Sequence, residues 1–422
     1  MNYKSLFNYL TTLSTFGISQ LVAVGAALIR IPLIIHYLGV TNFGILVTMS
    51  QIFPLLNILT VSTRIKSRIH FSRSSDSLDL LLKNSVHLEI STAVRVGNWI
   101  GMITVLLLFI VKKVFAEFSQ EIHMSVLALM TTIGFTSTTL LFGTLYGLYD
   151  VRGKQNFISG FDLVSSVISV PLTLFGIKQK LGTDYFFFVT SLTFIMPGFI
   201  LAILEWKLFK NMKSKDLKKW EYIKQNLKFA NQNIGNIIGN GFNLLIISKL
   251  IGFTDAALYS ICEKIFSGIA IPNGALAPLQ FTEMAKNSKN ISSQKRTRHL
   301  LTRVIKLNLI FSASVAVILC SIFPILFNIL SRATLPIPIL IGTVVAINNL
   351  LFATFTSFFP YLSVSGGYFD VVILPLLNGI FSLLLSLLLV SKIGVLGAPV
   401  SGMCVNGLCI LYLIKKYHLK SG

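Results

Sequence analysis

A stripe of asparagines interrupts an apolar stretch of the sequence. Residues 231–243 read NQNIGNIIGNGFN and continue as LLIISKLIG. Side chains spaced three or four residues apart share one face of a helix, and four amides have this spacing: Asn233, Asn236, Asn240 and Asn243. Because an unpaired amide in hydrocarbon is costly, we expect the stripe to face other helices or water. Gly235 and Gly239 form a small-residue edge beside it, where two helices can approach closely.

Charged side chains inside apolar stretches are the second feature. Arg30 and Lys264 are cations, whereas Asp162 and Glu263 are acids. In a bilayer such residues face protein or a water-filled cavity. The sequence has no glycine-rich phosphate loop followed by Lys and a hydroxyl residue, and no His, Cys or carboxylate spacing typical of a metal site. We therefore expect no ATP hydrolysis, no metal and no catalytic residue, which leaves binding, ion coupling or local pairing for these charges.

Composition places these residues in a membrane protein. The chain is 54% hydrophobic and 12% charged, whereas soluble proteins are about 25% charged. Stretches of roughly 20 apolar residues, enough to cross about 30 Å of hydrocarbon, recur throughout it. We predict an all-α polytopic fold with twelve transmembrane helices, at residues 16–38, 43–62, 96–112, 122–145, 157–177, 185–206, 229–251, 254–281, 307–330, 335–362, 369–390 and 394–414.

The distribution of basic residues predicts the orientation in the membrane. The loops after even-numbered segments, together with both termini, hold 27 of the 36 Lys and Arg residues, the loops after odd-numbered segments hold 6, and 3 lie within segments. Basic loops stay on the cytoplasmic side. We therefore expect both termini and the basic loops at 207–228 and 286–306 to be cytoplasmic. The net charge of +21 is thus explained by topology and lipid headgroups, and we expect no nucleic acid partner.

The basic loop at 207–228 divides the segments into two sets of six, which share a short repeat. YLGVTNFGILVTMSQIF (37–53) aligns without a gap onto LIGFTDAALYSICEKIF (250–266), so that Gly39 pairs with Gly252 and Thr41 with Thr254. Because each set has an even number of segments, both keep the same orientation. We predict a six-helix bundle at 1–206, a cytoplasmic linker at 207–228 and a six-helix bundle at 229–422, around a central cleft.

The first two segments resemble a known transporter family. RIPLIIHYLGVTNFGILVTMSQIFPLLN (30–57) is similar to the opening of the polysaccharide transporters in the multidrug/oligosaccharidyl-lipid/polysaccharide (MOP) exporter superfamily, particularly bacterial O-antigen flippases of the Wzx type. The resemblance implies a MOP/MATE-like fold and a flippase without a cofactor. Its cargo would be an undecaprenyl-diphosphate-linked oligosaccharide, moved by alternating access from the cytoplasmic to the periplasmic leaflet of the inner membrane. Other O-antigen assembly proteins are candidate partners.

This resemblance suggests roles for the polar residues. Arg30 and Lys264, at matching depth near the midplane, would bind the diphosphate. The asparagine stripe would bind the sugars, together with Gln20, which the repeat places on the corresponding face of the first segment. Lys249, near the periplasmic end of segment seven, would draw the headgroup outward. The alternatives are that the amides only join neighbouring helices and that each cation forms a local ion pair with Glu263 or Asp162.

The two acidic residues have two interpretations as well. Asp162 and Glu263 are candidate carriers of a coupling ion, H⁺ or Na⁺, because an acid in hydrocarbon can bind and release one. The alternative is that each is a static partner of a nearby Arg or Lys.

Other functions are compatible with parts of this pattern. A capsule or exopolysaccharide exporter would differ only in its glycan, which the sequence does not reveal. A multidrug exporter of the same superfamily should offer buried acids to a cationic drug, yet Asp162 and Glu263 are balanced by Arg30 and Lys264. A glycan polymerase or ligase should have a large periplasmic loop, yet the longest such break spans only residues 112–121.

Overall fold

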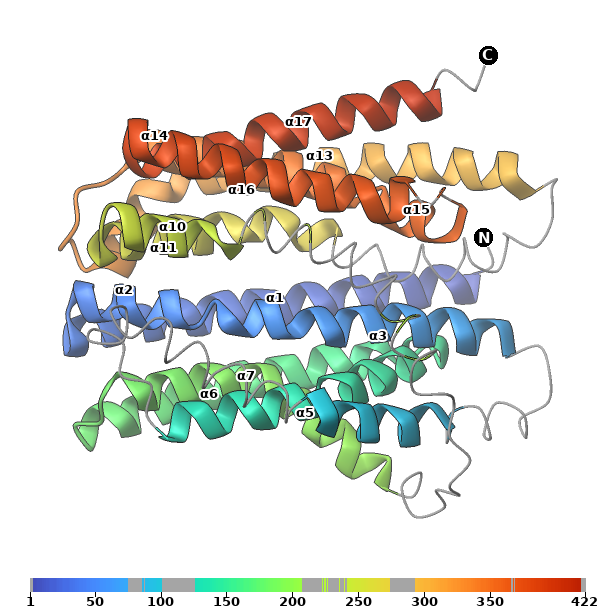
Figure 1. Ribbon diagram of the computed structural model, residues 1–422, viewed down its shortest axis with the longest axis horizontal. Helices are drawn as coiled ribbons and strands as arrows, with labels where there is room; N and C mark the ends of the chain where they lie inside the picture. Colours follow the sequence, from blue (N-terminus) through green and yellow to red (C-terminus); the bar gives the residue numbers. More distant parts are fainter. Residues whose placement is uncertain are drawn as a thin grey trace. The chain divides into compact units, whose positions relative to one another are not determined.

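The structure of the chain is a computed structural model (Figure 1). It describes residues 3–74, 86, 88–100, 126–206, 222, 224, 226, 235, 239, 241–273, 293–365, 367 and 369–418. The described residues are helical apart from short connections, and they include helical residues in each of the twelve predicted segments. The predicted all-α polytopic fold is confirmed. By their contacts the residues form two units, which are described separately: unit 1 (Met1–Gln51 and Ile234–Gly422) and unit 2 (Ile52–Asn233).

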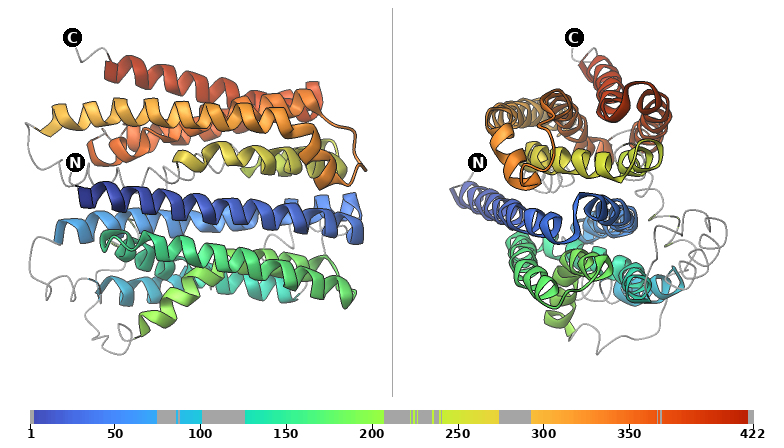
Figure 2. Two further views of the ribbon diagram at one scale, coloured as in Figure 1. Left: turned by 180° about the vertical axis from the view of Figure 1, so that it is seen from behind. Right: turned by 90° about the vertical axis from the view of Figure 1, so that its left-hand side faces the viewer.

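Unit 2 is a bundle of nearly parallel and antiparallel helices (Figures 1 and 2). Its long helices are α3 (Ile52–Ser74), α5 (Val126–Val151), α6 (Gln155–Lys178) and α7 (Thr183–Leu204). Helix α5 packs along α3 through two glycines four residues apart. A Cβ on Gly143 would lie 2.4 Å from the carbonyl oxygen of Thr60, and one on Gly147 would lie 2.8 Å from the Cβ of Ser67. The two backbones can approach this closely only because these side chains are absent.

An ion-pair cluster joins the same two helices of unit 2. Asp150 of α5 is buried and accepts hydrogen bonds from two arginines of α3. The Nε and Nη2 atoms of Arg64 donate to its two carboxylate oxygens at 2.7 and 2.8 Å, and Nε of Arg68 donates at 2.9 Å. Arg64 and Arg68 are one helical turn apart, so both guanidinium groups reach one carboxylate. The sequence analysis did not single out these three residues.

Unit 1 contains both long and short helical elements. They are α1 (Tyr3–Leu38), α2 (Val40–Met49), α10 (Asn243–Leu250), α11 (Phe253–Phe266) with a 3₁₀ turn (Ser267–Ala270), α13 (Ser293–Ser331), α14 (Ile339–Thr356), α15 (Phe359–Ser365), a π turn (Phe369–Ile373), α16 (Leu374–Ile393), a second 3₁₀ turn (Gly394–Leu396) and α17 (Gly397–His418). In Figures 1 and 2, α1 begins and α17 ends at the same end of this unit.

The aligned repeats meet inside unit 1. Gly39, between α1 and α2, and Gly252, between α10 and α11, both have a positive φ, 81° and 146°, which glycine adopts without strain. Each therefore allows the chain to turn sharply into the next helix. Helices α2 and α11 pack against each other, and the hydroxyl oxygens of Thr41 and Thr254, which the alignment equates, lie 3.5 Å apart. This contact between equivalent residues supports the repeat.

Two elements differ from the sequence-based prediction. Segment two is not one helix but α2 and α3, separated at Ser50 and Gln51. Pro54 has no N–H to donate to the carbonyl of Ser50, so the helix breaks there. The basic stretch predicted as a loop at 286–306 is helical from 293 onward and forms the first turns of α13. Hydropathy shows which residues lie in the hydrocarbon of the membrane. Helix α13 is longer than its apolar part and continues beyond the hydrocarbon.

The grouping by contacts also differs from the two predicted bundles. Residues 1–51, which contain α1 and α2, group with the C-terminal helices of unit 1. Most of the predicted linker at 207–228 lies outside the described residues, so that boundary stays a prediction. By length and composition, six described stretches could cross a membrane, and the last of them, Phe369–Tyr417, contains both α16 and α17.

The predicted small-residue edge packs against α16. A Cβ on Gly235 would lie 1.8 Å from the carbonyl oxygen of Pro375, and one on Gly379 would lie 2.0 Å from the carbonyl oxygen of Gly235. Near the next turn, Oγ of Ser382 lies 3.3 Å from the carbonyl oxygen of Gly239, to which it donates. Segment seven and α16 therefore cross at backbone contact.

We expect Gly379→Ala to reduce the stability of the protein. The added methyl group meets backbone, which cannot rotate away, and such overpacking costs about 1–3 kcal/mol. Thermal unfolding of the detergent-purified protein should show a lower midpoint. The control is Gly407→Ala in α17, where a Cβ would have no atom within 4 Å and alanine favours the helix. Equal midpoints for the two variants would contradict the close crossing.

We expect Asp150→Asn to destabilise the protein much more than Glu205→Gln. The first change leaves two largely buried guanidinium groups without their carboxylate, which costs about 3–5 kcal/mol. The second removes the partner of Arg152, whose side chain is 36% exposed, and exposed pairs contribute about 0–1 kcal/mol. The same unfolding measurement compares them, and similar midpoints would show that the cluster does not hold α3 to α5.

Candidate functional site

The two candidate cargo-binding cations, Arg30 and Lys264, both lie in unit 1. Arg30 is in α1, nine residues before Gly39, or about 13 Å along the helix. Lys264 is in α11, ten residues after Thr254, or about 15 Å. Because α2 and α11 meet at Thr41 and Thr254, these two distances start from the same end of the unit. The structure therefore places both cations at similar depth.

The two cations are close enough to influence each other. The positive charge of Arg30 acts on the ammonium group of Lys264. Arg30 is partly buried and Lys264 is exposed. Glu263 precedes Lys264, and its charge also acts on Lys264, yet neither residue forms an ion pair with another residue in the described part of the chain. The predicted alternative of a Glu263–Lys264 ion pair is therefore not found there.

The one member of the asparagine stripe that the structure describes is engaged between helices. Asn243 is buried. Its Oδ1 accepts a hydrogen bond from Oγ of Ser386 at 3.0 Å, and its Nδ2 lies 3.4 Å from the hydroxyl oxygen of Tyr259, to which it donates. Asn243 thus joins α10 to α16 and α11, as the alternative reading expects. The other three lie outside the described residues: Asn233, Asn236 and Asn240.

Two further candidates in unit 1 can be placed only by their helices. Gln20 is in α1, but its side chain is not described. Lys249 is exposed in the last turn of α10, three residues before Gly252. The repeat equates Lys249 with His36, three residues before Gly39 in the last turn of α1. Both repeats therefore carry a basic side chain beside the glycine turn.

Asp162 lies in unit 2, near the start of α6. The positive charge of Arg64 acts on it, so it borders the cluster of Arg64, Arg68 and Asp150. That cluster has two cations and one acid. This position fits the static-partner alternative, and ion coupling by Asp162 stays untested.

Sequence reasoning missed a second chain of buried amides. In unit 1, Nδ2 of Asn378 donates to Oδ1 of Asn406 at 3.0 Å, and Nδ2 of Asn406 donates to Oδ1 of Asn348 at 3.1 Å. The chain links α16, α17 and α14, and all three residues are buried. Each is an amide within an apolar segment, so the signal used for the asparagine stripe could have found them. Their mutual contacts follow only from the fold.

Comparison with known proteins shows the fold. No protein-family profile and no curated protein sequence matches this sequence. Solved structures that are similar to it include the following three. A lipid II flippase, MurJ, in an inward closed conformation is 14% identical, with a TM-score of 0.66 over 95% of this chain and 87% of that chain. An inward-facing multidrug resistance MATE family transporter of the MOP superfamily is 12% identical, with a TM-score of 0.67 over 98% and 100%.

The third similar structure is a mutant of the MATE transporter VcmN from Vibrio cholerae. It is 13% identical, with a TM-score of 0.62 over 96% of this chain and 98% of that chain. At these identities a likeness shows architecture and not activity. The chain has the all-α polytopic membrane fold of MurJ and the MATE transporters.

Proposed function

We propose that this chain is a flippase for an undecaprenyl-diphosphate-linked oligosaccharide, an O-antigen repeat unit, which it moves from the cytoplasmic to the periplasmic leaflet of the bacterial inner membrane. The observation that carries the proposal is the pair of cations, Arg30 of α1 and Lys264 of α11, which lie at similar distances from the same end of unit 1. Similarity to a lipid II flippase, which moves a lipid-linked cargo, supports the same class of substrate.

A diphosphate suits this pair of cations. Two like charges near each other in a membrane protein repel, and each is costly there. A cargo with two negative phosphates relieves both penalties at once. The guanidinium of Arg30 presents a planar fork to phosphate oxygens, whereas the ammonium of Lys264 acts as a point charge. Lys264 is also exposed and forms no ion pair in the described part of the chain, so it is available for a ligand.

Transport by alternating access needs one closure on each face of the membrane, and each closure must be able to open. We assign the closure on the outer face to the contact of α2 with α11. A Cβ on Gly44 would lie 1.9 Å from the carbonyl oxygen of Phe253, so the two backbones touch there. The predicted orientation puts this end on the periplasmic side and both termini in the cytoplasm. Separation of α2 from α11 would then release the cargo outward.

The rest of the predicted site belongs to the same proposal. The stripe residues Asn233, Asn236 and Asn240 would bind sugar hydroxyls, because an amide both donates and accepts. Asn243 is tied to neighbouring helices, and we assign it to the support of this face. Energy would come from an H⁺ or Na⁺ gradient, with Asp162 and Glu263 as the candidate carriers.

A multidrug exporter is the second candidate, because MATE transporters are as similar in fold as MurJ. A cationic drug would have to approach two cations, Arg30 and Lys264, past one neighbouring acid, Glu263. The charge of the site therefore favours an anionic cargo. Capsule and exopolysaccharide repeat units share the lipid diphosphate, and the same site would serve them.

We expect Arg30→Ala and Lys264→Ala each to abolish surface glycan at normal protein levels. Each change removes a charge-assisted contact to the diphosphate, and such contacts contribute about 1.5–3 kcal/mol, roughly a tenfold or greater loss of binding. Arg30→Lys should be partly active because it keeps the charge but not the fork. Lipid-linked repeat units should accumulate on the cytoplasmic face. The control is Lys392→Ala, an exposed cation at the end of α16. Normal glycan in the double variant Arg30→Ala, Lys264→Ala would refute the site.

We expect a cross-link between α2 and α11 to stop transport. In a protein whose four native cysteines are replaced, Thr41→Cys and Thr254→Cys place two thiols where the hydroxyl oxygens lie 3.5 Å apart. A short bifunctional thiol reagent should join them, and a reducible reagent should allow recovery after reduction. Each single variant treated in the same way is the control. Full transport by the cross-linked protein would show that this contact is not a closure.

A further inference from the structure

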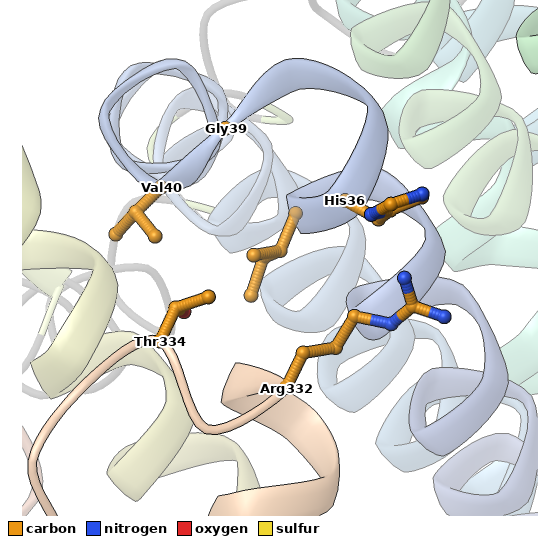
Figure 3. Close-up of a pocket in the computed structure, with 6 residues that line it drawn as sticks. His36, Gly39, Val40, Arg332 and Thr334 are labelled. Carbon is orange, nitrogen blue, oxygen red and sulfur yellow. The ribbon is translucent and has the colours of Figure 1, made fainter.

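An open pocket of about 410 Å³ lies where α1 turns into α2 (Figure 3). One wall comes from that turn, with Ile35, His36, Gly39 and Val40, and the other from the turn after α13, with Arg332 and Thr334. All of these residues belong to unit 1. The pocket is at the end of the unit where Thr41 meets Thr254, which the predicted orientation places on the outer face of the membrane.

The polar lining of this pocket suits an anion. Arg332 and His36 are exposed, and none of the described residues that line the pocket is acidic. Figure 3 shows the Arg332 side chain extending toward the turn of α1 that carries His36. Neither side chain makes a hydrogen bond or ion pair with another residue in the described part of the chain. A guanidinium and an imidazole N–H therefore offer donors without an acceptor.

The backbone around the pocket adds to this preference. Helix α2 begins at Val40, and no side chain caps its first turn. The first N–H groups of a helix carry a partial positive charge that favours an anion. Arg332 has a left-handed backbone, with φ of 52°, an uncommon conformation for a residue with a side chain. This uncommon backbone lies at the residue whose guanidinium Figure 3 shows beside α1.

We propose that His36 and Arg332 bind the diphosphate of the cargo at the outer ends of α1 and α13, as a second subsite reached after Arg30 and Lys264. The inference rests on the proposed function. His36 lies six residues beyond Arg30 on α1, about 9 Å along the helix. In this proposal His36 and Arg332 bind a diphosphate that has moved from the first subsite to this end of the unit, and Arg332 provides the two-pronged contact.

The test measures binding of inorganic diphosphate to the full chain in nanodiscs of phosphatidylcholine, by calorimetry. All proteins carry Arg30→Ala and Lys264→Ala, so that the first subsite does not contribute. This parent should bind diphosphate saturably. Arg332→Ala should weaken binding about tenfold or more, and His36→Ala severalfold. Arg332→Ala keeps a Cβ, so the left-handed backbone is no more strained than before, and Arg332→Gln is a second variant that keeps the length of the side chain.

The matched control is Lys392→Ala, which removes an exposed cation in the last turn of α16 that is not part of this pocket. Unchanged binding in this control supports the subsite. Equal weakening by Lys392→Ala and Arg332→Ala would indicate attraction to surface charge only, and unchanged binding in Arg332→Ala and Arg332→Gln would overturn the proposal. Thermal unfolding verifies that each variant is folded.

A second arm separates the cargo from ordinary lipid, whose headgroup has the same phosphate chemistry. In nanodiscs that contain phosphatidylglycerol, a site for the cargo diphosphate should still bind inorganic diphosphate. Loss of binding there would assign the pocket to lipid headgroups and overturn the cargo subsite. Because the parent lacks both residues of the first subsite, failure of the proposed function would appear in the glycan assay and not in this measurement.

Discussion

Hydrocarbon offers no hydrogen-bond partner, and this constraint decides where the polar side chains of the chain lie. Asn243 bonds to Ser386 and Tyr259 across three helices. Asn378 begins a chain of amides through three others. Even the bundle of unit 2 is joined by a carboxylate, Asp150, between two guanidinium groups. Lys264 differs from these residues because it is exposed and forms no ion pair with the described residues.

The hydrocarbon of the membrane also explains how the helices are held together. Lipid is as apolar as leucine, so burial between helices contributes little, and close contact must replace it. Glycines provide that contact in both units: Gly143 lies against α3, Gly44 against α11, and Gly379 against segment seven. Each permits a backbone approach that any larger residue would prevent. The crossing of segment seven with α16 and the proposed closure between α2 and α11 therefore both depend on glycine contacts.

The sequence was sufficient for features that depend on local pattern. Hydropathy predicted twelve segments, each of which contains helical residues in the described part of the chain; spacing located the glycine edge at Gly235, and an ungapped match located the repeat. The break between α2 and α3 could also have been predicted, because Pro54 lies four residues after Ser50. The sequence analysis predicted one helix there because the apolar run is long enough to cross the membrane. The helical start of α13 was missed because hydropathy reports immersion in hydrocarbon and not helix length.

The contacts between distant residues were beyond the sequence. Ser386 is 143 residues from Asn243, and nothing in either segment marks the other as its partner. The pairing of amides with hydroxyls, the convergence of two arginines on Asp150 and the approach of Arg332 to the turn of α1 all depend on how helices pack. The grouping of α1 and α2 with the C-terminal helices has the same origin. The sequence showed which polar residues lie in apolar segments. It did not show which of them bond to side chains of neighbouring helices.

The contact of Thr41 with Thr254 resembles the isologous interface of a homodimer, in which a residue meets its own copy across a two-fold axis. In a true dimer every position beside that axis is duplicated, so a ligand on the axis meets identical groups from both sides. Here the two copies belong to one chain and have diverged: His36 corresponds to Lys249, and Arg30 to Asn243. A fused pair can thus present different chemistry to the two ends of one molecule. The headgroup of the proposed cargo has phosphate at one end and sugar at the other. Two repeats that have diverged can bind such a headgroup in a single orientation.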